Sequence, residues 1–500
     1  MYFQPQQHDF TPVPDRDGAW PVIVAGAGPI GLTAALGLAK RGVEVLVLEA
    51  GDSVSYGSRA ICVSRNSLQI LDRLGAGQRF VDAALPWTGG RSYYRDQQVL
   101  QFEMPAAAEY ARPPMVNMSQ SVAEQILVEQ VQREPLVTLR WQCAVRRAAQ
   151  DVDGVDVGID TPAGPGTVRA RWLVGADGAR SAVRAALGVG LSGTSYEGRY
   201  VIADIHWPSA WPTERRVWFD PPSNPGATII MHRQPDDIWR VDYQLRPEDD
   251  PEAEVAEDRV RERIERHLRW LGNELPWTLE WVSLYRAHAL SADSYRHGRV
   301  LLAGDAAHLV PIFGVRGLNS GLEDADDLAW KLSLVEAGAS DRLLDSYSAE
   351  RRDAWAQNIA SARKSTLFMT PGTPGYRMTR DAALLLAAHD PVFSHLLNPR
   401  QSSATHARRS PITSPDQRGS GERVRPGDMV DDRRLAAGEL DGVRAATLHE
   451  AIGAGFAVLG VGVPAEVLDD ACRRARQAVG AALPVAGLRV AAGTGLADAL

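Results

Sequence analysis

Residues 20–49 read WPVIVAGAGPIGLTAALGLAKRGVEVLVLE, and this stretch of the chain decides the fold. An apolar run over residues 20–28 leads through several glycines into a segment rich in Leu and Ala over residues 30–41. A second apolar run, Val43 to Leu48, follows directly. Runs of this length and composition predict buried strands, and the segment between them predicts a helix. We therefore expect a βαβ unit in a buried parallel sheet.

The glycines between the first strand and the helix form the pattern Gly-x-Gly-x-x-Gly. Its residues are Gly26, Gly28, Pro29, Ile30 and Gly31. The first glycine of such a pattern permits a tight turn, the second lets the backbone approach a pyrophosphate, and the third lets helix pack on strand. Glu49 lies 18 residues after Gly31, the spacing at which a carboxylate meets a ribose hydroxyl. The stretch predicts a dinucleotide site without choosing between FAD and a nicotinamide cofactor; a purely structural turn is the alternative.

Length, charge and cysteine content exclude several kinds of partner. A chain of 500 residues exceeds what one core supports, so we expect several packed units. The net charge of −8 argues against a nucleic-acid partner. The three cysteines lie far apart without Cys-x-x-Cys spacing, so neither a metal site nor a disulfide framework is predicted. No apolar run resembles a secretory signal or a membrane span, which predicts a cytoplasmic protein that binds no membrane.

Two further apolar runs, Trp172 to Asp177 and Val300 to Asp305, each end at an aspartate. Both predict central strands whose carboxyl ends face a ligand. Between them, residues 195–290 alternate apolar and polar side chains, which predicts an antiparallel sheet. The predicted units are a flexible N-terminal arm (1–19), the first part of a dinucleotide-binding domain (20–194), a substrate-binding sheet domain (195–290), the second part of the dinucleotide-binding domain with a long helix (291–366), a helical segment and linker (367–430), and a C-terminal domain (431–500).

Both aspartates lie within longer motifs. Residues 175–184 read GADGARSAVR, and residues 304–321 read GDAAHLVPIFGVRGLNSG. With the N-terminal glycines, these motifs resemble the FAD-dependent single-component aromatic hydroxylases of the para-hydroxybenzoate hydroxylase and phenol hydroxylase type, over roughly residues 20–365. The resemblance implies an α/β fold, in which an FAD-binding Rossmann-like domain is interleaved with an antiparallel-sheet substrate domain. It also implies a thioredoxin-like C-terminal appendage.

The resemblance further implies which residues contact FAD. Asp305 is expected to hydrogen-bond the ribityl chain, and the helix start at Gly317 to direct N–H groups toward the flavin ring. The full set comprises Gly26, Gly28, Pro29, Ile30, Gly31, Glu49, Arg59, Gln120, Val145, Asp177, Asp305, Gly317, Leu318 and Asn319. Three alternatives stay open: Arg59 could form a surface salt bridge, Gln120 could cap a helix, and Asp177 could only stabilise a turn.

The activity implied by the resemblance is hydroxylation of a small phenolic or otherwise electron-rich aromatic substrate. NADPH or NADH is the transient co-substrate, and O₂ supplies the oxygen through a flavin C4a-hydroperoxide. His232 and Tyr243 are candidate catalytic residues that orient the substrate hydroxyl, and Phe313 is a candidate to pack on its ring. Ordinary packing is the alternative for each. The resemblance is compatible with a homodimer and leaves the oligomeric state open.

The sequence departs from the family pattern in two places. Ile312 stands where relatives commonly follow Pro311 with a second proline, and the C-terminal unit has no Cys-x-x-Cys, so a redox role for it is not expected. His308 has no second His or Cys at ligand spacing, which favours a packed, hydrogen-bonded histidine over a metal ligand. A flavin-dependent halogenase would share the FAD motifs but carry a Trp-x-Trp-x-Ile-Pro segment, which this sequence lacks. A non-catalytic FAD-binding protein is a further alternative.

Overall fold

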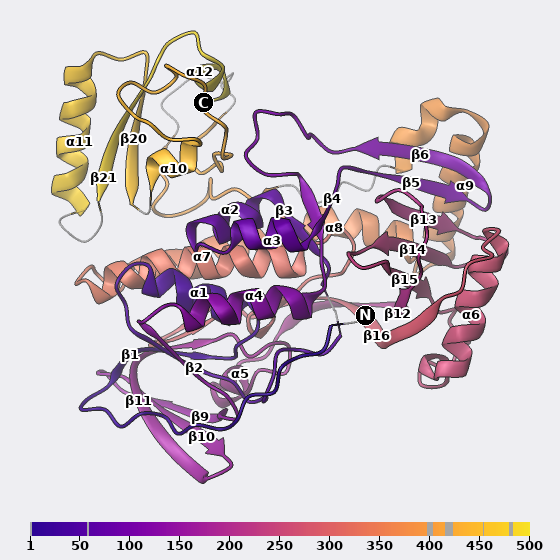
Figure 1. Cartoon of the computed structure of the whole chain (residues 1–500), viewed down its shortest axis with the longest axis horizontal. Coiled ribbons are helices and arrows are strands. Elements are labelled where there is room, and N and C mark those ends of the chain that lie inside the picture. Colours follow the sequence, from indigo (N-terminus) through magenta and orange to yellow (C-terminus); the bar gives the residue numbers. More distant parts are fainter. Residues whose placement is uncertain (1–2, 58–59, 398–403, 416–423, 454, 480–483) are drawn as a thin grey trace.

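The structure is a computed structural model that describes residues 3–57, 60–397, 404–415, 424–453, 455–479 and 484–500. Two large sheets are connected by long helices, and a smaller C-terminal unit packs beside them (Figure 1). The predicted α/β class is confirmed. Among the described residues, no helix combines the length and the apolar character needed to span a membrane.

The first sheet contains the predicted βαβ unit. Strand β1 (Trp20–Ala25) pairs in parallel with β2 (Val45–Leu48) on one side and with β11 (Gly164–Gly175) on the other. The parallel array continues through β18 (Val300–Leu302) beside β11 and β8 (Val137–Arg140) beside β2. Antiparallel additions are β9 (Ala144–Gln150), β10 (Val155–Thr161) and β17 (Arg296–His297). The carboxyl ends of β1, β2, β11 and β18 therefore meet at one edge of the sheet.

Three helices lie together on one face of this sheet: α1 (Pro29–Ala39), α4 (Gln120–Gln132) and α7 (Gly317–Glu336) (Figure 1). Gly37 permits close packing of α1 on α7, because a Cβ atom at this position would lie 2.7 Å from the Cβ of Ala329. Smaller elements nearby are α2 (Arg65–Arg73), α3 (Gly77–Ala83), α5 (Ala182–Ala186) and the three-stranded sheet of β3 (Cys62–Ser64), β7 (Met115–Asn117) and β4 (Leu85–Trp87).

The second sheet has the strand order β19-β16-β12-β15-β14-β13-β5-β6 and is mostly antiparallel. Its strands are β12 (Ser192–His206), β13 (Arg215–Phe219), β14 (Thr228–Arg233), β15 (Ile238–Gln244), β16 (Thr278–Ser291), β19 (His308–Leu309), β5 (Gly89–Tyr94) and β6 (Gln97–Glu103). Residues 89–103 thus belong to this sheet, although the sequence analysis assigns them to the first part of the dinucleotide-binding domain. The parallel pairing of β5 with β13 joins segments far apart in the chain, and no local pattern specifies it.

Alternation along the strands gives the second sheet two different faces. On one face, Val201, Val241 and Tyr243 enter an apolar core that is closed by α6 (Glu257–Trp270). On the other face, Ile202 and Asp242 border the space between the two sheets. The substrate sheet therefore presents a core face and a cavity face.

Both ends of the chain are packed onto the rest of the molecule. The described part of the N-terminal arm, residues 3–19, has no regular secondary structure. His8 nevertheless stacks on Trp141 with ring centroids 4.5 Å apart, and Phe10 packs against the hydrophobic core of the first sheet. The described part of the arm, predicted to be flexible, is thus bound to the domain surface. In the C-terminal unit, β20 (Phe456–Val461) and β21 (Val485–Val490) are parallel and α11 (Ala465–Val479) connects them. Helices α10 (Leu448–Ile452) and α12 (Gly495–Ala499) complete this unit.

A buried carboxylate connects α7 to the turn after β18 and to α8 (Leu343–Met369). The Oδ2 atom of Asp324 accepts hydrogen bonds from the backbone N–H of Gly304 at 3.0 Å and from Nε2 of His308 at 2.6 Å. Its Oδ1 atom accepts one from Nε of Arg351 at 2.6 Å. Burial raises the pKa of Asp324, but His308 and Arg351 outweigh this effect and hold the pKa below its ordinary value. His308 is a packed, hydrogen-bonded residue, as predicted.

We expect Asp324→Asn to lower the free energy of unfolding by on the order of 3 kcal/mol, because it removes the negative charge that the buried side chains of His308 and Arg351 face. Asp326→Asn is the matched control on the same helix: its carboxylate pairs with Arg73, and both side chains are 28% exposed. That exposed pair should contribute less than about 1 kcal/mol. Urea denaturation followed by far-ultraviolet circular dichroism compares the variants, and equal losses would contradict a special role for Asp324.

Candidate functional site

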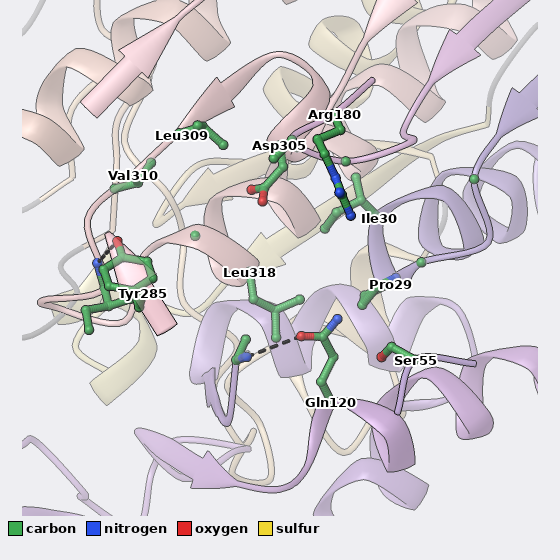
Figure 2. Close-up of a pocket in the computed structure, with 18 of the residues that line it drawn as sticks. Pro29, Ile30, Ser55, Gln120, Arg180, Tyr285, Asp305, Leu309, Val310 and Leu318 are labelled. Atoms are coloured by element: carbon green, nitrogen blue, oxygen red, sulfur yellow. Dashed lines mark hydrogen bonds between the residues drawn. The ribbon is translucent and has the colours of Figure 1, made fainter. Parts of the chain in front are cut away.

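A cavity of about 860 Å³ lies between the carboxyl edge of the first sheet and the cavity face of the second. Pockets that hold cofactors or small ligands typically enclose about 300–1,000 Å³. In Figure 2, Asp305 and Arg180 point into this space, and Gln120 and Leu318 face them. The cavity thus brings together segments that are hundreds of residues apart.

The glycine turn forms one end of the cavity, and each glycine has its own steric reason. Gly26 has a φ of +101°, and a Cβ atom there would lie 2.6 Å from the carbonyl oxygen of Ala176. A Cβ atom at Gly31 would lie 2.0 Å from the carbonyl oxygen of Gly26. Gly28 is different, because no atom of the described residues lies within 4 Å of its Cβ position and the residue borders the cavity. The turn therefore leaves an open space against the start of α1, which fits the phosphate groups of a dinucleotide.

Glu49 borders the cavity at the end of β2 and also holds the glycine turn. Its Oε2 atom accepts a hydrogen bond from the backbone N–H of Ala27 at 2.6 Å, and its Oε1 atom accepts one from Gly51 at 2.8 Å. The predicted ribose ligand is thus placed at the expected edge. It has a second function that the sequence analysis missed, the bracing of the turn itself.

The second aspartate motif borders the cavity beside the glycine turn, since a Cβ atom at Gly304 would lie 2.9 Å from Cγ1 of Ile30. Gly304 has a φ of +58°, which places Asp305 at the cavity surface. Side-chain hydrogen bonds hold the turn. The backbone N–H of Gly304 donates to Asp324, and Nη1 of Arg184 donates to the carbonyl oxygen of Ala306 at 2.9 Å. This arrangement fits a polyol chain bound by Asp305, as the sequence motif predicts.

Asp177 also borders the cavity, but its carboxylate is engaged within its own loop. It accepts hydrogen bonds from the hydroxyl of Ser181 and from the backbone N–H of Val183 at 3.1 Å. These bonds fix the loop at the start of α5. The structure therefore supports the turn-stabilising alternative and keeps Asp177 at the cavity wall.

Gln120 and Val145, both predicted to contact FAD, border the cavity. Oε1 of Gln120 accepts from the backbone N–H of Ala60 at 3.2 Å, and Nε2 donates to Glu124 at 2.8 Å. The N-cap of α4 is Ser119, so the capping alternative for Gln120 does not hold. The predicted contact Arg59 lies outside the described residues.

The start of α7 forms part of the cavity wall through Gly317 and Leu318. Asn319 is not one of the residues that border it. Its Oδ1 atom accepts a hydrogen bond from the backbone N–H of Ser64 at 2.9 Å, and its Nδ2 atom donates one to the carbonyl of Val315 at 2.6 Å, so Asn319 braces neighbouring segments. Val315 has a φ of +55°, a left-handed conformation that is unusual for a β-branched residue. The predicted cofactor contact Asn319 thus supports the loop instead of bordering the cavity.

The three predicted catalytic residues are placed differently. His232 and Phe313 border the cavity, and both are buried. Burial, followed by the charges of Arg215 and Arg240, lowers the pKa of His232 well below its ordinary value. Tyr243 lies on the core face of the sheet, where its hydroxyl donates to the carbonyl of Glu254 at 3.3 Å. The expectation that Tyr243 orients a substrate hydroxyl is therefore corrected, since its strand position points it away from the cavity.

Ile312, the departure from the family pattern, has a structural consequence. Its backbone N–H donates to the hydroxyl oxygen of Tyr285 at 3.0 Å (Figure 2). A proline at this position has no N–H and could not form the bond. Tyr285 also borders the cavity. Having isoleucine instead of proline at position 312 therefore allows a hydrogen bond that holds this tyrosine in place.

Several cavity residues escape the sequence analysis. They are Ser55, Arg180, Arg215, Asp242 and Tyr285. The alternating pattern of β15 predicts a two-faced strand but not which face meets the cavity. Successive side chains of a strand point to opposite faces, so a prediction that chooses the wrong face of β15 names Tyr243 as the cavity residue in place of Asp242.

The chain matches the family model described as "FAD binding domain" over residues 19–362. It is 33% identical over 342 residues to 3-(3-hydroxy-phenyl)propionate/3-hydroxycinnamic acid hydroxylase of Mycolicibacterium smegmatis, which covers 67% of this chain and 58% of that relative. It is 30% identical over 379 residues to para-nitrophenol 4-monooxygenase of a Pseudomonas species, which covers 74% of this chain and 92% of that relative. The chain thus spans less than two thirds of the first relative's length and most of the second's.

Solved structures give the same grouping. p-Nitrophenol 4-monooxygenase from Pseudomonas putida has a TM-score of 0.66 and 29% identity, and covers 76% of this chain and 96% of that chain. The flavin-dependent monooxygenase PieE, in complex with FAD and substrate, has a TM-score of 0.79 and 25% identity, and covers 96% of this chain and 91% of that chain.

Gly28→Val tests the cofactor end of the cavity without disturbing the fold. Gly28 has extended backbone with a φ of −72°, and its Cβ position has no atom of the described residues within 4 Å. We therefore expect a change in unfolding free energy within about 0.5 kcal/mol, together with at least about a hundredfold loss of FAD affinity, on the order of 3 kcal/mol. Fluorescence titration of the flavin-free protein measures the affinity. Gly31→Ala, which collides with backbone, should instead destabilise the protein, and unchanged FAD affinity in Gly28→Val would exclude this turn as the phosphate site.

Glu49→Ala should weaken FAD binding by on the order of 1–3 kcal/mol, because it removes a charged acceptor at the cavity edge. Glu49→Gln keeps one carbonyl acceptor and should lose less. The same titration distinguishes the variants. If Glu49→Ala retains the full affinity, Glu49 only braces the turn.

Proposed function

The chain belongs to the FAD binding domain family, and from this membership we propose that it is an FAD-dependent monooxygenase that hydroxylates a phenolic or otherwise electron-rich aromatic ring with NAD(P)H and O₂. One observation carries the proposal. A single cavity joins the glycine turn, Glu49 and Asp305 at one end to a buried sheet wall with polar side chains at the other. Such a cavity provides for a dinucleotide and for a small ring beside it.

The residues that would hold FAD are those whose geometry fits its chemical groups. The open space at Gly28 and the start of α1 suit the pyrophosphate, Glu49 suits the ribose, and Asp305 suits the ribityl chain. The start of α7 at Gly317 would direct backbone N–H groups toward an electron-rich ring edge. When bound, FAD supplies the redox chemistry, namely acceptance of a hydride and activation of O₂.

The chain's own contribution is to bind, orient and enclose the substrate. The cavity face of the second sheet is buried, so it keeps bulk water away from the reacting ring. Phe313 is 2% exposed and lies edge-on to Tyr200 with centroids 5.4 Å apart, so its ring is held rigidly at the cavity wall. His232, on β14, presents a neutral imidazole that could hydrogen-bond a substrate hydroxyl.

The names of the relatives support a phenolic substrate. One relative is named as a hydroxylase of 3-hydroxyphenylpropionate and 3-hydroxycinnamic acid, and another as a monooxygenase of para-nitrophenol. Each of these substrates carries a ring hydroxyl. An electrophilic oxygen donor reacts at an electron-rich carbon, which a ring hydroxyl provides.

The reaction itself is tested with FAD-loaded protein, NADH or NADPH, and a panel of phenols and phenolic acids under ¹⁸O₂. We expect at least one phenol to accelerate NAD(P)H oxidation by about tenfold or more and to gain one ¹⁸O atom by mass spectrometry. The Gly28→Val variant, which should lack FAD, is the negative control. A substrate that turns over without gaining ¹⁸O would exclude a monooxygenase. Absence of any substrate-stimulated oxidation across the panel would favour a non-catalytic flavoprotein.

A further inference from the structure

Three buried polar side chains share the cavity wall of the second sheet. Arg215 on β13, His232 on β14 and Asp242 on β15 are 6%, 6% and 7% exposed, and all three border the cavity. Each has a buried polar atom that finds no hydrogen-bond partner among the described residues: Nε of Arg215, Nδ1 of His232 and Oδ1 of Asp242. Buried polar groups are normally satisfied in folded proteins. Three unsatisfied groups on one wall indicate that a polar ligand completes their hydrogen bonds.

Strand register fixes the direction of Asp242. It lies opposite Ile230 on β14 and Ile202 on β12, and these two neighbours border the cavity as well. Its own neighbours in sequence, Val241 and Tyr243, point into the core on the other face. The carboxyl group of Asp242 therefore faces the cavity.

A second carboxylate on the same face shows what a purely structural aspartate looks like here. Asp204 receives Nε and Nη2 of Arg240 at 2.9 Å each, and Nε2 of Gln234 at 3.2 Å. Asp242 has no ion pair among the described residues. Burial raises the pKa of Asp242 to about 7, while Arg240 and Arg215 act in the opposite direction. Asp242 is therefore a buried group that can exchange a proton near neutral pH.

We propose that Asp242 accepts the hydroxyl proton of the aromatic substrate, which makes it a catalytic base of the proposed hydroxylation. The substrate O–H bond breaks, its electron pair stays on the oxygen as a phenolate, and the proton forms an O–H bond on Asp242. The total charge of the pair is unchanged, and the guanidinium of Arg215 stabilises the phenolate. The ring carbon that gains the hydroxyl loses its hydrogen as a proton, which leaves in the water formed from the second oxygen atom of O₂. The phenolate oxygen of the product then takes the proton back from Asp242, which regenerates the carboxylate. The phenolate ring is more electron-rich than the phenol, so oxygen transfer to it is faster.

The other titratable groups around Asp242 are poorer proton acceptors. The groups that face it or sense its charge are Arg215, His232, Arg240, Asp204, Tyr200, Tyr285 and Cys62. Burial and the two arginines hold the pKa of His232 far below neutrality. Burial raises the pKa of the Cys62 thiol to about 12, and it also raises the pKa of the Tyr200 hydroxyl above its ordinary value, so both groups stay protonated near neutral pH. Only Asp242 in this set combines an unpartnered oxygen with a pKa near 7.

The proposal rests on the proposed hydroxylase function and is tested with two matched phenols. One keeps its hydroxyl proton at the assay pH, and the other carries ring fluorines that make it ionise in solution. We expect Asp242→Asn to lower kcat/KM for hydroxylated product by about a hundredfold with the first phenol, and by less than about fivefold with the second. Asp242→Glu should restore part of the activity. Glu248→Gln, a 67% exposed carboxylate of the same domain, is the control expected to match the parent protein.

The pH profile supplies an independent readout that needs no variant. With the un-ionised phenol, kcat/KM of the parent protein should rise with pH through an apparent pKa of about 7, because only ionised Asp242 accepts a proton. Asp242→Asn should lose this rise. An equal loss on both phenols, or a parent profile without the rise, would overturn the proposal while hydroxylation itself stands. If the parent forms no hydroxylated product from any phenol, the proposed function fails and this proposal fails with it.

Discussion

The carboxylate of Asp324 is the interaction on which the site depends. It accepts a backbone hydrogen bond from the turn that presents Asp305, and it faces His308 and Arg351 inside a fully buried environment. A buried charge is tolerated only when its partners satisfy it, so this network allows one arrangement of the turn and two helices. The start of α7 and the Asp305 turn are consequently fixed relative to each other, and both border the cavity.

Polar groups at and around the cavity are of two kinds. Asp177, which borders the cavity, and Asp204 and Asn319, which do not, form their hydrogen bonds within the protein and hold strands and loops in place. Arg215, His232 and Asp242 keep unsatisfied atoms at the cavity wall. Satisfied groups stabilise the fold, whereas unsatisfied buried groups cost free energy until a ligand binds. This difference, more than residue type, separates the groups that hold the fold from those that can still bind a ligand.

Local strain and a departure from the family pattern occur in the same loop. Val315 takes a left-handed conformation, and the N–H of Ile312 is bonded to Tyr285. Both features lie between the Asp305 turn and the start of α7, where the loop passes the cavity. A strained backbone conformation persists only where surrounding interactions hold it. The hydrogen bond from Asn319 to the carbonyl of Val315 is one of these interactions. The loop is thus held rigid where it passes between the Asp305 turn and the cavity face of the second sheet.

The sequence by itself determined the βαβ unit, the glycine turn, Glu49 and the two aspartate motifs, because each depends on short-range spacing between neighbouring residues. It also indicated antiparallel strands within residues 195–290, since alternation is a local signal, but not the helix α6 in the same range. Tertiary structure alone decided that β5 and β6 join this sheet, that Asn319 braces a loop, and that Asp242 instead of Tyr243 faces the cavity. The physical reason is that a strand pattern specifies two faces, while the choice of the face that meets the cavity depends on packing between segments far apart in the chain.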